Sequence, residues 1–211
     1  MPESNPCVVV IDDDREFSQS LGRLLRSVGL ESRLFASVAD FVVSDSPDRP
    51  TCLVLDVRLP ERSGLDFQRD LVAAGVTLPI VFITGHGDIP MTVQAMRAGA
   101  IEFLTKPFRE QDILDAINVG LGRDRTRRDQ EKALGALRAQ FGTLSPRERA
   151  ILNRVVEGRL NKQIAGEMGI AESTVKVHRS NIMRKVNATS VPALCRMVDK
   201  LKLSPGSPEP S

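Results

Sequence analysis

The chain has 211 residues, of which 41% are hydrophobic and 27% charged, and no apolar run approaches the roughly 20 residues that span a bilayer. This composition is typical of a soluble globular protein with one large domain or two small ones, and it excludes membrane-embedded and fibrous classes. Nothing near Met1 resembles a secretory signal, so we expect a cytoplasmic protein with no membrane partner. Its three cysteines, Cys7, Cys52 and Cys195, are too widely spaced for a CxxC zinc site or a disulfide framework, and we expect them to be reduced.

Charge is distributed unevenly along the chain. Residues 1–122 contain 11 Lys or Arg against 18 Asp or Glu, a net charge of −7, whereas residues 123–211 contain 18 against 9, a net charge of +9. The second part therefore favours nucleic acid as a partner, with a solvated charged surface as the simpler alternative. The last aromatic residue is Phe141. Because single-strand and RNA readers usually stack bases on aromatic side chains, the basic part favours duplex DNA.

Short apolar runs alternate with segments of helical spacing in the first half. The runs predict buried strands and lie at 7–11, 33–35, 53–55, 80–83 and 101–104. The segments with apolar residues three or four positions apart predict helices and lie at 17–28, 38–42, 65–72, 93–96 and 113–117. This alternation predicts an α/β fold in which helices cover both faces of a parallel sheet.

The second half has helix-boundary signals and no comparable β-branched run. The sequence Ser145-Pro146-Arg147-Glu148 is a capping box with Pro at the first helical position, and Gly158 is expected to end that helix. Asn161 is expected to cap a second helix, which Gly169 closes. A third helix is predicted at 172–186 and a fourth, capped by Ser190, up to about residue 203. Two short helices joined by a Gly-containing turn predict a helix-turn-helix.

The segments outside these two regions are simpler. Residues 123–143 are rich in Arg and Gln, and we expect a helical linker. A continuous coiled coil through it is the less favoured reading, because Asp124 and Arg128 interrupt the apolar seam. The Pro-rich residues 204–211 are predicted to be a disordered tail.

Acidic residues follow the predicted strands of the first half. The first strand ends in Asp12-Asp13-Asp14 and the third in Asp56. In an open parallel sheet, ligands bind beyond the carboxyl ends of the strands, so these carboxylates are expected to converge. Clustered carboxylates repel one another unless a cation is bound, and all-oxygen ligands select Mg²⁺.

The fourth and fifth strands end in residues suited to phosphate. A carboxylate beside Mg²⁺ can attack phosphorus and form an acyl phosphate, and that transfer needs positive charge and hydrogen bonds for the phosphoryl oxygens. Lys106 supplies the charge, Thr84 supplies the hydroxyl, and Gly85 leaves the phosphoryl group accessible.

Together these residues resemble the receiver domain of bacterial response regulators over about residues 6–122. The resemblance depends on Val10-Ile11-Asp12-Asp13-Asp14, Leu55-Asp56-Val57-Arg58-Leu59-Pro60, Ile83-Thr84-Gly85-His86-Gly87-Asp88-Ile89-Pro90 and Ala98-Gly99-Ala100 through Lys106-Pro107-Phe108. It implies a flavodoxin-like (βα)5 fold with Asp56 as phosphoacceptor from a sensor histidine kinase. It also implies Mg²⁺ held by Asp12, Asp13, Asp56 and the carbonyl of Arg58, an aromatic switch at Phe103 and a cis peptide at Lys106-Pro107.

The branch is also suggested by sequence. His86-Gly87-Asp88-Ile89-Pro90 is similar to the FixJ branch, which includes regulators of nitrogen fixation and of aromatic-compound catabolism, and the StyR type is nearest.

Residues 144–203 likewise resemble the LuxR-type four-helix DNA-binding domain of NarL/FixJ regulators. The matching segments are Leu144-Ser145-Pro146-Arg147-Glu148-Arg149, Glu157-Gly158, Asn161-Lys162-Gln163-Ile164-Ala165 and Thr174-Val175-Lys176-Val177-His178. We expect Lys176, Val177 and Ser180 to read bases, with Val177 against a thymine methyl. Phosphates and neighbouring groups are expected to contact Thr174, Arg179, Arg184 and Lys185. Ala171 stands where the family has Ser or Thr, so the third helix lacks a cap that contributes about 1 kcal/mol.

These expectations give a non-enzymatic transcription regulator that forms a phosphorylation-dependent homodimer on promoter DNA, with RNA polymerase as a further candidate partner. Attraction between the acidic and basic parts could mask the DNA-binding helix. Phosphorylation adds about −1.5 to −2 charges to the acidic part, which would strengthen that attraction rather than release it. We therefore expect activation to work through a conformational change. We expect Thr84 to move towards the phosphoryl group, Phe103 to turn inward, and the fourth helix, fifth strand and fifth helix to form a dimer face.

Two alternatives stay open from the sequence. One is an aspartyl-phosphate phosphatase, but such enzymes place a second Asp two residues after the nucleophile, where this chain has Arg58. The other is a DNA-binding protein whose first half is a fixed dimerisation module. The complete set of Asp12, Asp13, Asp56, Thr84 and Lys106 argues against it.

Overall fold

The computed structural model describes residues 5–44, 48–60 and 62–202 of the chain. The chain folds into two compact units, Met1–Arg128 and Asp129–Ser211. The predicted disordered tail, 204–211, lies outside the described residues. Within the described ranges, no helix is both long enough and apolar enough to cross a membrane.

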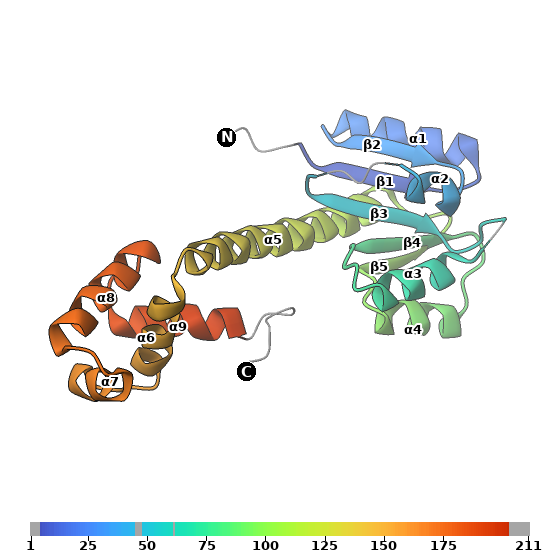
Figure 1. Ribbon diagram of the computed structural model, residues 1–211. Helices are drawn as coiled ribbons and strands as arrows, with labels where there is room; N and C mark the ends of the chain where they lie inside the picture. Colours follow the sequence, from blue (N-terminus) through green and yellow to red (C-terminus); the bar gives the residue numbers. More distant parts are fainter. Residues whose placement is uncertain (1–4, 45–47, 61, 203–211) are drawn as a thin grey trace. The chain divides into compact units, whose positions relative to one another are not determined.

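The first unit contains a five-stranded parallel sheet with the strand order β2-β1-β3-β4-β5 (Figure 1). The strands are β1 (Cys7–Ile11), β2 (Glu31–Phe35), β3 (Thr51–Asp56), β4 (Ile80–Thr84) and β5 (Glu102–Thr105). Every residue of β1, β3 and β4 is buried, which explains why these strands are continuous apolar runs rather than alternating patterns. The predicted α/β fold with a parallel sheet is confirmed.

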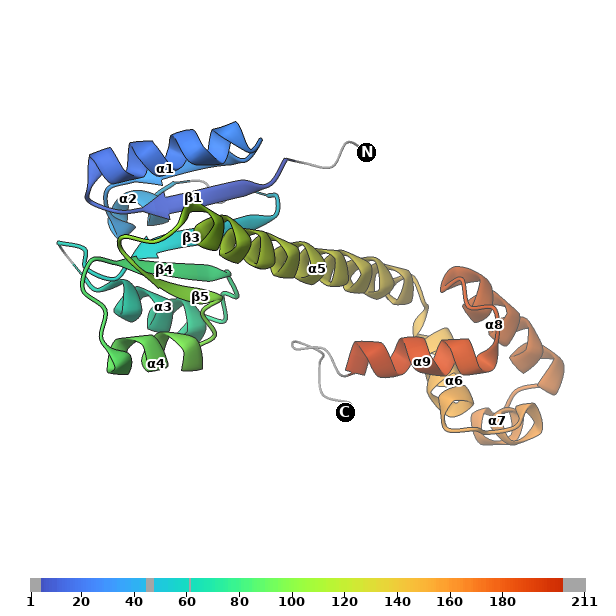
Figure 2. The same cartoon turned by 180° about the vertical axis from the view of Figure 1, so that it is seen from behind.

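Helices cover both faces of this sheet. They are α1 (Arg15–Ser27), α2 (Val38–Val42), α3 (Gly64–Ala73), α4 (Ile89–Arg97) and α5 (Glu110–Gly142). Val9 and Ile11 pack towards α2, α3 and α4, whereas Val8 and Val10 pack towards α1 and α5 (Figure 2), because successive side chains of a strand point to opposite faces. The order of strands and helices brings the carboxyl ends of β1, β3, β4 and β5 to one edge.

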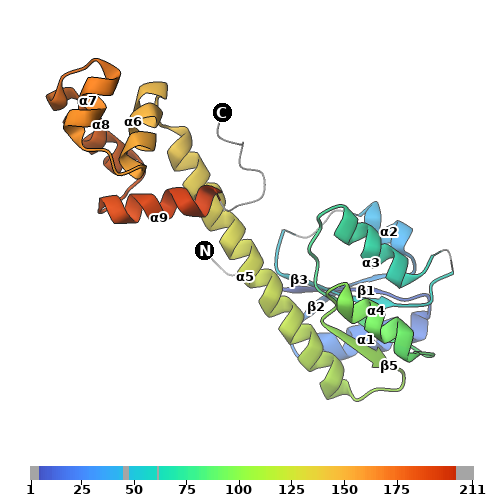
Figure 3. The same ribbon diagram turned by 90° about the horizontal axis from the view of Figure 1, so that it is seen from below.

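In the described part of the second unit, four helices that follow the end of α5 surround one apolar core (Figures 1 and 3). They are α6 (Pro146–Val156), α7 (Asn161–Met168), α8 (Glu172–Lys185) and α9 (Val191–Lys202). The capping box of Ser145 and Glu148 is present at the start of α6, and Gly158 and Gly169 have the positive φ angles typical of helix ends. The predicted four-helix arrangement is therefore confirmed.

One predicted cap is wrong. Leu160, not Asn161, is the N-cap residue of α7, and Asn161 is the first helical residue. The side-chain oxygen of Asn161 instead accepts a hydrogen bond from Nη1 of Arg179 at 2.6 Å, so a tertiary partner has replaced the local backbone one. The expected absence of a side-chain cap at Ala171 is confirmed.

The last helix of the first unit is longer than its apolar pattern. Helix α5 runs without interruption from Glu110 to Gly142 and so includes nearly all of the segment 123–143 that the sequence suggests is a linker. Gly120 lies on its sheet-facing side, where an added Cβ would lie 2.5 Å from Sγ of Cys52. A glycine at this position allows the helix to pack directly on β3.

Candidate functional site

Three acidic side chains meet at the carboxyl edge of the sheet. Asp12 follows β1 and is buried, Asp56 is the last residue of β3 and is also buried, and Asp13 is exposed. One carboxylate oxygen from each residue lies within 4.8 Å of the other two. The structure thus brings the adjacent residues Asp12 and Asp13 together with Asp56, which lies 44 positions after Asp12 in the sequence.

The ammonium group of Lys106 lies between two of these carboxylates. Its Nζ is 2.6 Å from Oδ2 of Asp12 and 3.0 Å from Oδ2 of Asp56. The same Nζ lies 3.9 Å from the centroid of the Phe17 ring, a cation–π contact. The amide of Lys106 donates to the carbonyl of Thr84 at 2.7 Å, which holds the backbone of Lys106 against the end of β4. The Lys106–Pro107 peptide is cis, as expected.

Burial and charge act in opposite directions at this site. Burial raises the pKa of Asp12, and the hydrogen bond from Lys106 offsets only part of that effect. Burial by itself would lower the pKa of Lys106, but its hydrogen bonds to Asp12 and Asp56 raise that pKa above the ordinary value. Lys106 is therefore held in its charged form, as a group that binds phosphoryl oxygens must be.

The backbone after β3 also points at the acidic cluster. The amide of Arg58 donates to Oδ1 of Asp56 at 2.8 Å, while the Arg58 side chain is exposed. Gly64, at the start of α3, packs so closely that an added Cβ would overlap the carbonyl oxygen of Asp56. The sequence reasoning missed Gly64, because a glycine after a loop is equally typical of a simple turn.

The predicted switch residues lie on β4 and β5, the two strands that follow β3 in the sheet. Thr84 is the last residue of β4 and is buried, and its hydroxyl accepts from the amide of His86 at 3.3 Å. The ring of Phe103 on β5 is buried against Phe82, with centroids 6.1 Å apart. At Gly85 an added Cβ would meet nothing within 4 Å, so packing alone does not require glycine there.

Gly87 is a further residue that the sequence reasoning missed. An added Cβ at this position would lie 2.9 Å from Cγ2 of Thr105, 3.0 Å from Cε1 of Phe103 and 3.2 Å from Cγ2 of Thr84. Since real Cβ atoms essentially never approach within 3.0 Å, a side chain here would press on Thr84 and Phe103 together. Gly87 belongs to the segment His86-Gly87-Asp88-Ile89-Pro90 that carries the family resemblance, but that motif does not show what the glycine packs against.

The predicted DNA-binding residues occupy α8. The side chains of Thr174, Lys176, Val177, Ser180 and Arg184 are exposed, and Val175, Ile182 and Val186 form the buried stripe opposite them. Val177 is 59% exposed, an unusual position for an apolar residue in a charged helix. Five of the predicted positions are thus exposed on α8, and Arg179 is only partly exposed.

Lys185 differs from the other predicted DNA contacts. Its Nζ lies 2.7 Å from Oε2 of Glu148 and 3.3 Å from the carbonyl of Thr143. Glu148 is buried and also accepts from the amide of Ser145 at 2.8 Å. The hydrogen bond from Lys185, followed by the one from the Ser145 amide, lowers the pKa of Glu148 to about 2. Lys185 therefore connects the end of α8 to the start of α6.

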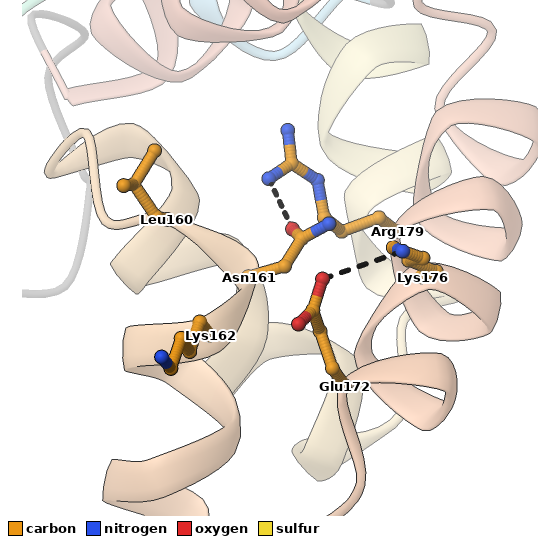
Figure 4. Close-up of a pocket in the computed structure, with 6 residues that line it drawn as sticks. All are labelled: Leu160, Asn161, Lys162, Glu172, Lys176 and Arg179. Carbon is orange, nitrogen blue, oxygen red and sulfur yellow. Dashed lines mark hydrogen bonds and ion pairs between the residues drawn. The ribbon is translucent and has the colours of Figure 1, made fainter.

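A recess of about 550 Å³ separates the start of α7 from the exposed side of α8 (Figure 4). Its lining is mostly basic or polar and consists of Leu160, Asn161, Lys162, Glu172, Lys176 and Arg179. In Figure 4 the Arg179 guanidinium points at Asn161, and Glu172 pairs with Lys176, with Oε1 3.3 Å from Nζ. Lys162 was not predicted as a site residue, although its position in the first turn of α7 is a signal for anion binding.

Comparison with known families covers both units. Residues 8–118 match the response regulator receiver domain, and residues 142–198 match the bacterial regulatory proteins of the luxR family. The chain is a response regulator. Its acidic cluster lies in the receiver match, and α8 lies in the luxR match.

Full-length relatives support the same assignment. Nodulation protein W of Bradyrhizobium diazoefficiens is 50% identical over 197 residues, covering 93% of this chain and 87% of that protein. Response regulator protein TmoT of Ectopseudomonas mendocina is 45% identical over 202 residues, covering 96% of this chain and 92% of that protein. The solved structure of response regulator StyR superimposes with a TM-score of 0.85 at 49% identity, covering 93% of this chain and all of that one. This response regulator is therefore a transcription regulator with a receiver domain and a LuxR-type DNA-binding domain.

Proposed function

We propose that phosphorylation of Asp56 by a sensor histidine kinase controls the DNA binding of this response regulator. The observation that supports the proposal is the position of the Asp56 carboxylate, which lies in the acidic cluster and 3.0 Å from the ammonium of Lys106. A carboxylate in such a place has a neighbouring positive charge to stabilise an incoming phosphoryl group. Turnover of a phosphoester is not expected, and the chain acts as a regulator rather than an enzyme.

Mg²⁺ is the ion that these residues would hold. Asp12, Asp13, Asp56 and the backbone carbonyl of Arg58 are the proposed ligands, and the three carboxylates are close enough to share one ion. Hard oxygen ligands in small number suit Mg²⁺, which keeps several waters. When bound, Mg²⁺ supplies charge neutralisation for phosphoryl oxygens. It would also favour the ionised form of Asp12, whose pKa is raised by burial.

The chain's own residues would then perform the transfer. A carboxylate oxygen of Asp56 attacks phosphorus of a phosphohistidine, the P–N bond breaks, and the electron pair leaves with the histidine ring. Lys106 and the hydroxyl of Thr84 bind the phosphoryl oxygens, and Gly85 leaves space for them. The product is an acyl phosphate at Asp56.

This product would change the loop after β4 and the surface beside it. To reach the phosphoryl group, the Thr84 hydroxyl must leave the backbone of His86, and Phe103 then repacks into the space that Thr84 vacates. On α4, Ile89 is 80% exposed, and Val93 is also exposed. An apolar surface of this kind favours a partner, and we propose that α4, β5 and the start of α5 form a homodimer face.

A dimer would present two copies of α8 to two half-sites in duplex promoter DNA. Lys176, Val177 and Ser180 are proposed to read bases. The proposed contacts with phosphates and neighbouring groups are Thr174, Arg179, Arg184 and Lys185. For these roles Arg179 and Lys185 would have to exchange their present partners, Asn161 and Glu148. RNA polymerase is a proposed further partner of the bound dimer.

The proposed domain limits are 6–122 for the receiver, 123–143 for the linker, 144–203 for the DNA-binding domain and 204–211 for the tail. The two family matches, over 8–118 and 142–198, support the two domains.

The proposal is tested by oligomeric state and DNA binding of the full chain. Sequences enriched from a random duplex library serve as the DNA probe, and acetyl phosphate with Mg²⁺ serves as the phosphoryl donor. We expect the native chain to dimerise and bind the probe more tightly after treatment, and D56N to do neither. D66N, which changes an exposed carboxylate on α3, is the matched control and is expected to behave as the native chain. A treated native chain that stays monomeric with unchanged DNA affinity would overturn the proposal.

A further inference from the structure

A second buried carboxylate, Asp124, lies in the receiver unit away from the acidic cluster. It belongs to α5, its side chain is 0% exposed, and it is not among the residues that the proposed phosphotransfer uses. Burying an ionised carboxylate is costly unless its hydrogen-bonding capacity is satisfied. The partners of Asp124 therefore indicate what it does.

Among the residues that the structure describes, Asp124 has three partners, and they lie on two elements. Its Oδ2 accepts from the backbone amide of Thr51 at 2.9 Å and from Nε of Arg128 at 2.7 Å. Its Oδ1 accepts from Nη2 and Nε of Arg127, at 2.6 and 3.1 Å. Nη1 of Arg128 extends the network to Oδ1 of Asp48 at 3.1 Å, so the segment before β3 is included as well.

This network closes the contact between α5 and the sheet. Ile113, Ile117 and Leu121 form the buried face of α5, and Asp124 takes the next position on the same face. Four residues later, at Arg128, the first unit ends. Asp124 is thus in the last turn by which α5 is attached to the receiver.

Thr51 and Asp56 are the two ends of the same strand. Thr51 begins β3 and is attached to α5 through Asp124, and Asp56 ends β3 in the acidic cluster. Helix α5 also begins shortly after Lys106, whose side chain contacts Asp56. Helix α5 is therefore attached to the start of β3 through Asp124, and the loop that leads into α5 contacts the end of β3 through Lys106.

Stability alone does not require a charged network at this place, because a set of packed apolar side chains in place of all its members could hold α5 on the sheet equally well. Replacing buried ion pairs by packed apolar residues is often neutral or stabilising. A carboxylate adds what an apolar residue lacks, which is a fixed direction: the Thr51 amide and the two guanidinium groups define the rotation and the position of α5 along its axis.

We infer that Asp124 is a positioning residue that locks α5 to the first residue of β3, and that this lock is required for phosphorylation at Asp56 to change DNA binding. The inference rests on the proposed function. With the lock closed, a shift of β5 or of the loop containing Lys106 moves α5 as a rigid rod into the segment 129–142. With the lock open, the same shift only rotates the start of α5 locally and does not reach the segment 129–142.

The test compares D124N with D129N in the full chain. Asn keeps an oxygen acceptor for the Thr51 amide but removes the negative charge that holds Arg127 and Arg128. Asp129 is an exposed carboxylate one turn further along the same helix, so D129N is a control matched in chemistry and in element. R128Q opens the lock from the other side and serves as a second variant should D124N fail to fold.

Two measurements separate positioning from simple stability. The first is hydrogen exchange in α5: we expect D124N and R128Q to accelerate exchange at 123–128, with 113–121 unchanged. The second is the ratio of DNA affinities with and without acetyl phosphate and Mg²⁺. Allosteric couplings are typically about 5-fold to 150-fold, and we expect D124N and R128Q to lose at least half of the gain on a logarithmic scale while their Asp56 is phosphorylated to the native extent.

The outcomes for the lock and for the proposed function are distinct. If D124N and R128Q keep the native affinity gain, or keep native exchange at 123–128, the lock is not required and the inference is overturned. If the native chain itself is not phosphorylated, the proposed function fails, and the exchange measurement alone decides whether the lock exists. A loss of the gain in D129N as well would also contradict the inference, because a general charge effect would then explain it.

Discussion

Replacing Glu148 with Gln removes a buried charge that connects two helices of the DNA-binding unit. Oε2 of Glu148 lies 2.7 Å from Nζ of Lys185 and 2.8 Å from the amide of Ser145. The E148Q side chain keeps the shape of the group and a possible hydrogen bond to the Ser145 amide. What it loses is the attraction between a carboxylate and an ammonium.

The pKa of Glu148 sets the size of the loss. Its pKa falls from the ordinary 4.5 to about 2, which corresponds to about 3 kcal/mol at 1.36 kcal/mol per unit. The Lys185 side chain is 34% exposed, and solvent screening reduces this figure to about 2 kcal/mol. Because the folded-state pKa is depressed, the stabilisation is complete above pH 4.5 and is lost as the pH falls towards 2.

Urea unfolding followed by circular dichroism measures this effect in the full chain. At neutral pH we expect E148Q to lower the free energy of unfolding of the DNA-binding unit by about 2 kcal/mol. At about pH 3 the difference between E148Q and the native chain should shrink to less than half, because Glu148 is then almost fully protonated in the unfolded state while it stays mostly ionised in the folded state. E157Q, at an exposed position after α6, is the control and should change little. A difference that does not vary with pH would refute the reasoning.

Three further predictions concern close packing and charge. G120A should lower the free energy of unfolding by about 1–3 kcal/mol, because the added Cβ would meet the sulfur of Cys52 on β3. The control G122A, whose added Cβ would meet nothing within 4 Å, should raise the free energy of unfolding slightly, because alanine has the higher helix propensity. The urea midpoints of the two variants measure both effects. G87A should press on the switch phenylalanine and threonine and lower the thermal midpoint, whereas G85A should not, and equal midpoints would contradict this. K176A should weaken binding to the enriched duplex and, if the residue contacts a phosphate rather than a base, reduce the salt slope of log K by about 1; titrations at several salt concentrations measure it.

Much of the fold can be predicted from the sequence because the strands are buried on both faces. The run from Cys7 to Ile11 has no polar residue, and its position before Asp12 places a carboxylate at the strand end. The convergence of Asp12 and Asp56 then follows from the rule that parallel strands share a carboxyl edge. Local signals were equally informative in the second unit, where the capping box at Ser145 marks the start of α6.

The features that could not be predicted depend on partners far away in the sequence. Asn161 is a residue type that often caps a helix, yet its side-chain oxygen accepts a hydrogen bond from Arg179, 18 positions later. Asp124 interrupts an apolar seam, which in the sequence only disfavours a coiled coil, but its hydrogen bond from the Thr51 amide, 73 positions earlier, makes it part of the receiver. Spacing along one element cannot show such pairs, because they depend on which elements the fold brings together.

The position of Lys185 illustrates the same limit for function. The sequence places Lys185 on the basic face of the third predicted helix of the second half, and its charge predicts a phosphate contact. The structure shows that the ammonium of Lys185 pairs with the carboxylate of Glu148, a contact that stabilises the second unit. The contact between Lys185 and DNA stays a prediction. Arg184, by contrast, donates a hydrogen bond to Asn181 and remains exposed on α8.

The central claim is that Asp56 accepts a phosphoryl group in an Mg²⁺-dependent reaction. The most direct measurement is the intact mass of the full chain after incubation with acetyl phosphate, with and without Mg²⁺, for the native chain and for D56N. The account predicts the gain of one phosphoryl group in the native chain, only with Mg²⁺, and no gain in D56N. A native chain that binds Mg²⁺ but gains no mass, or a D56N chain that gains as much as the native one, would contradict the account.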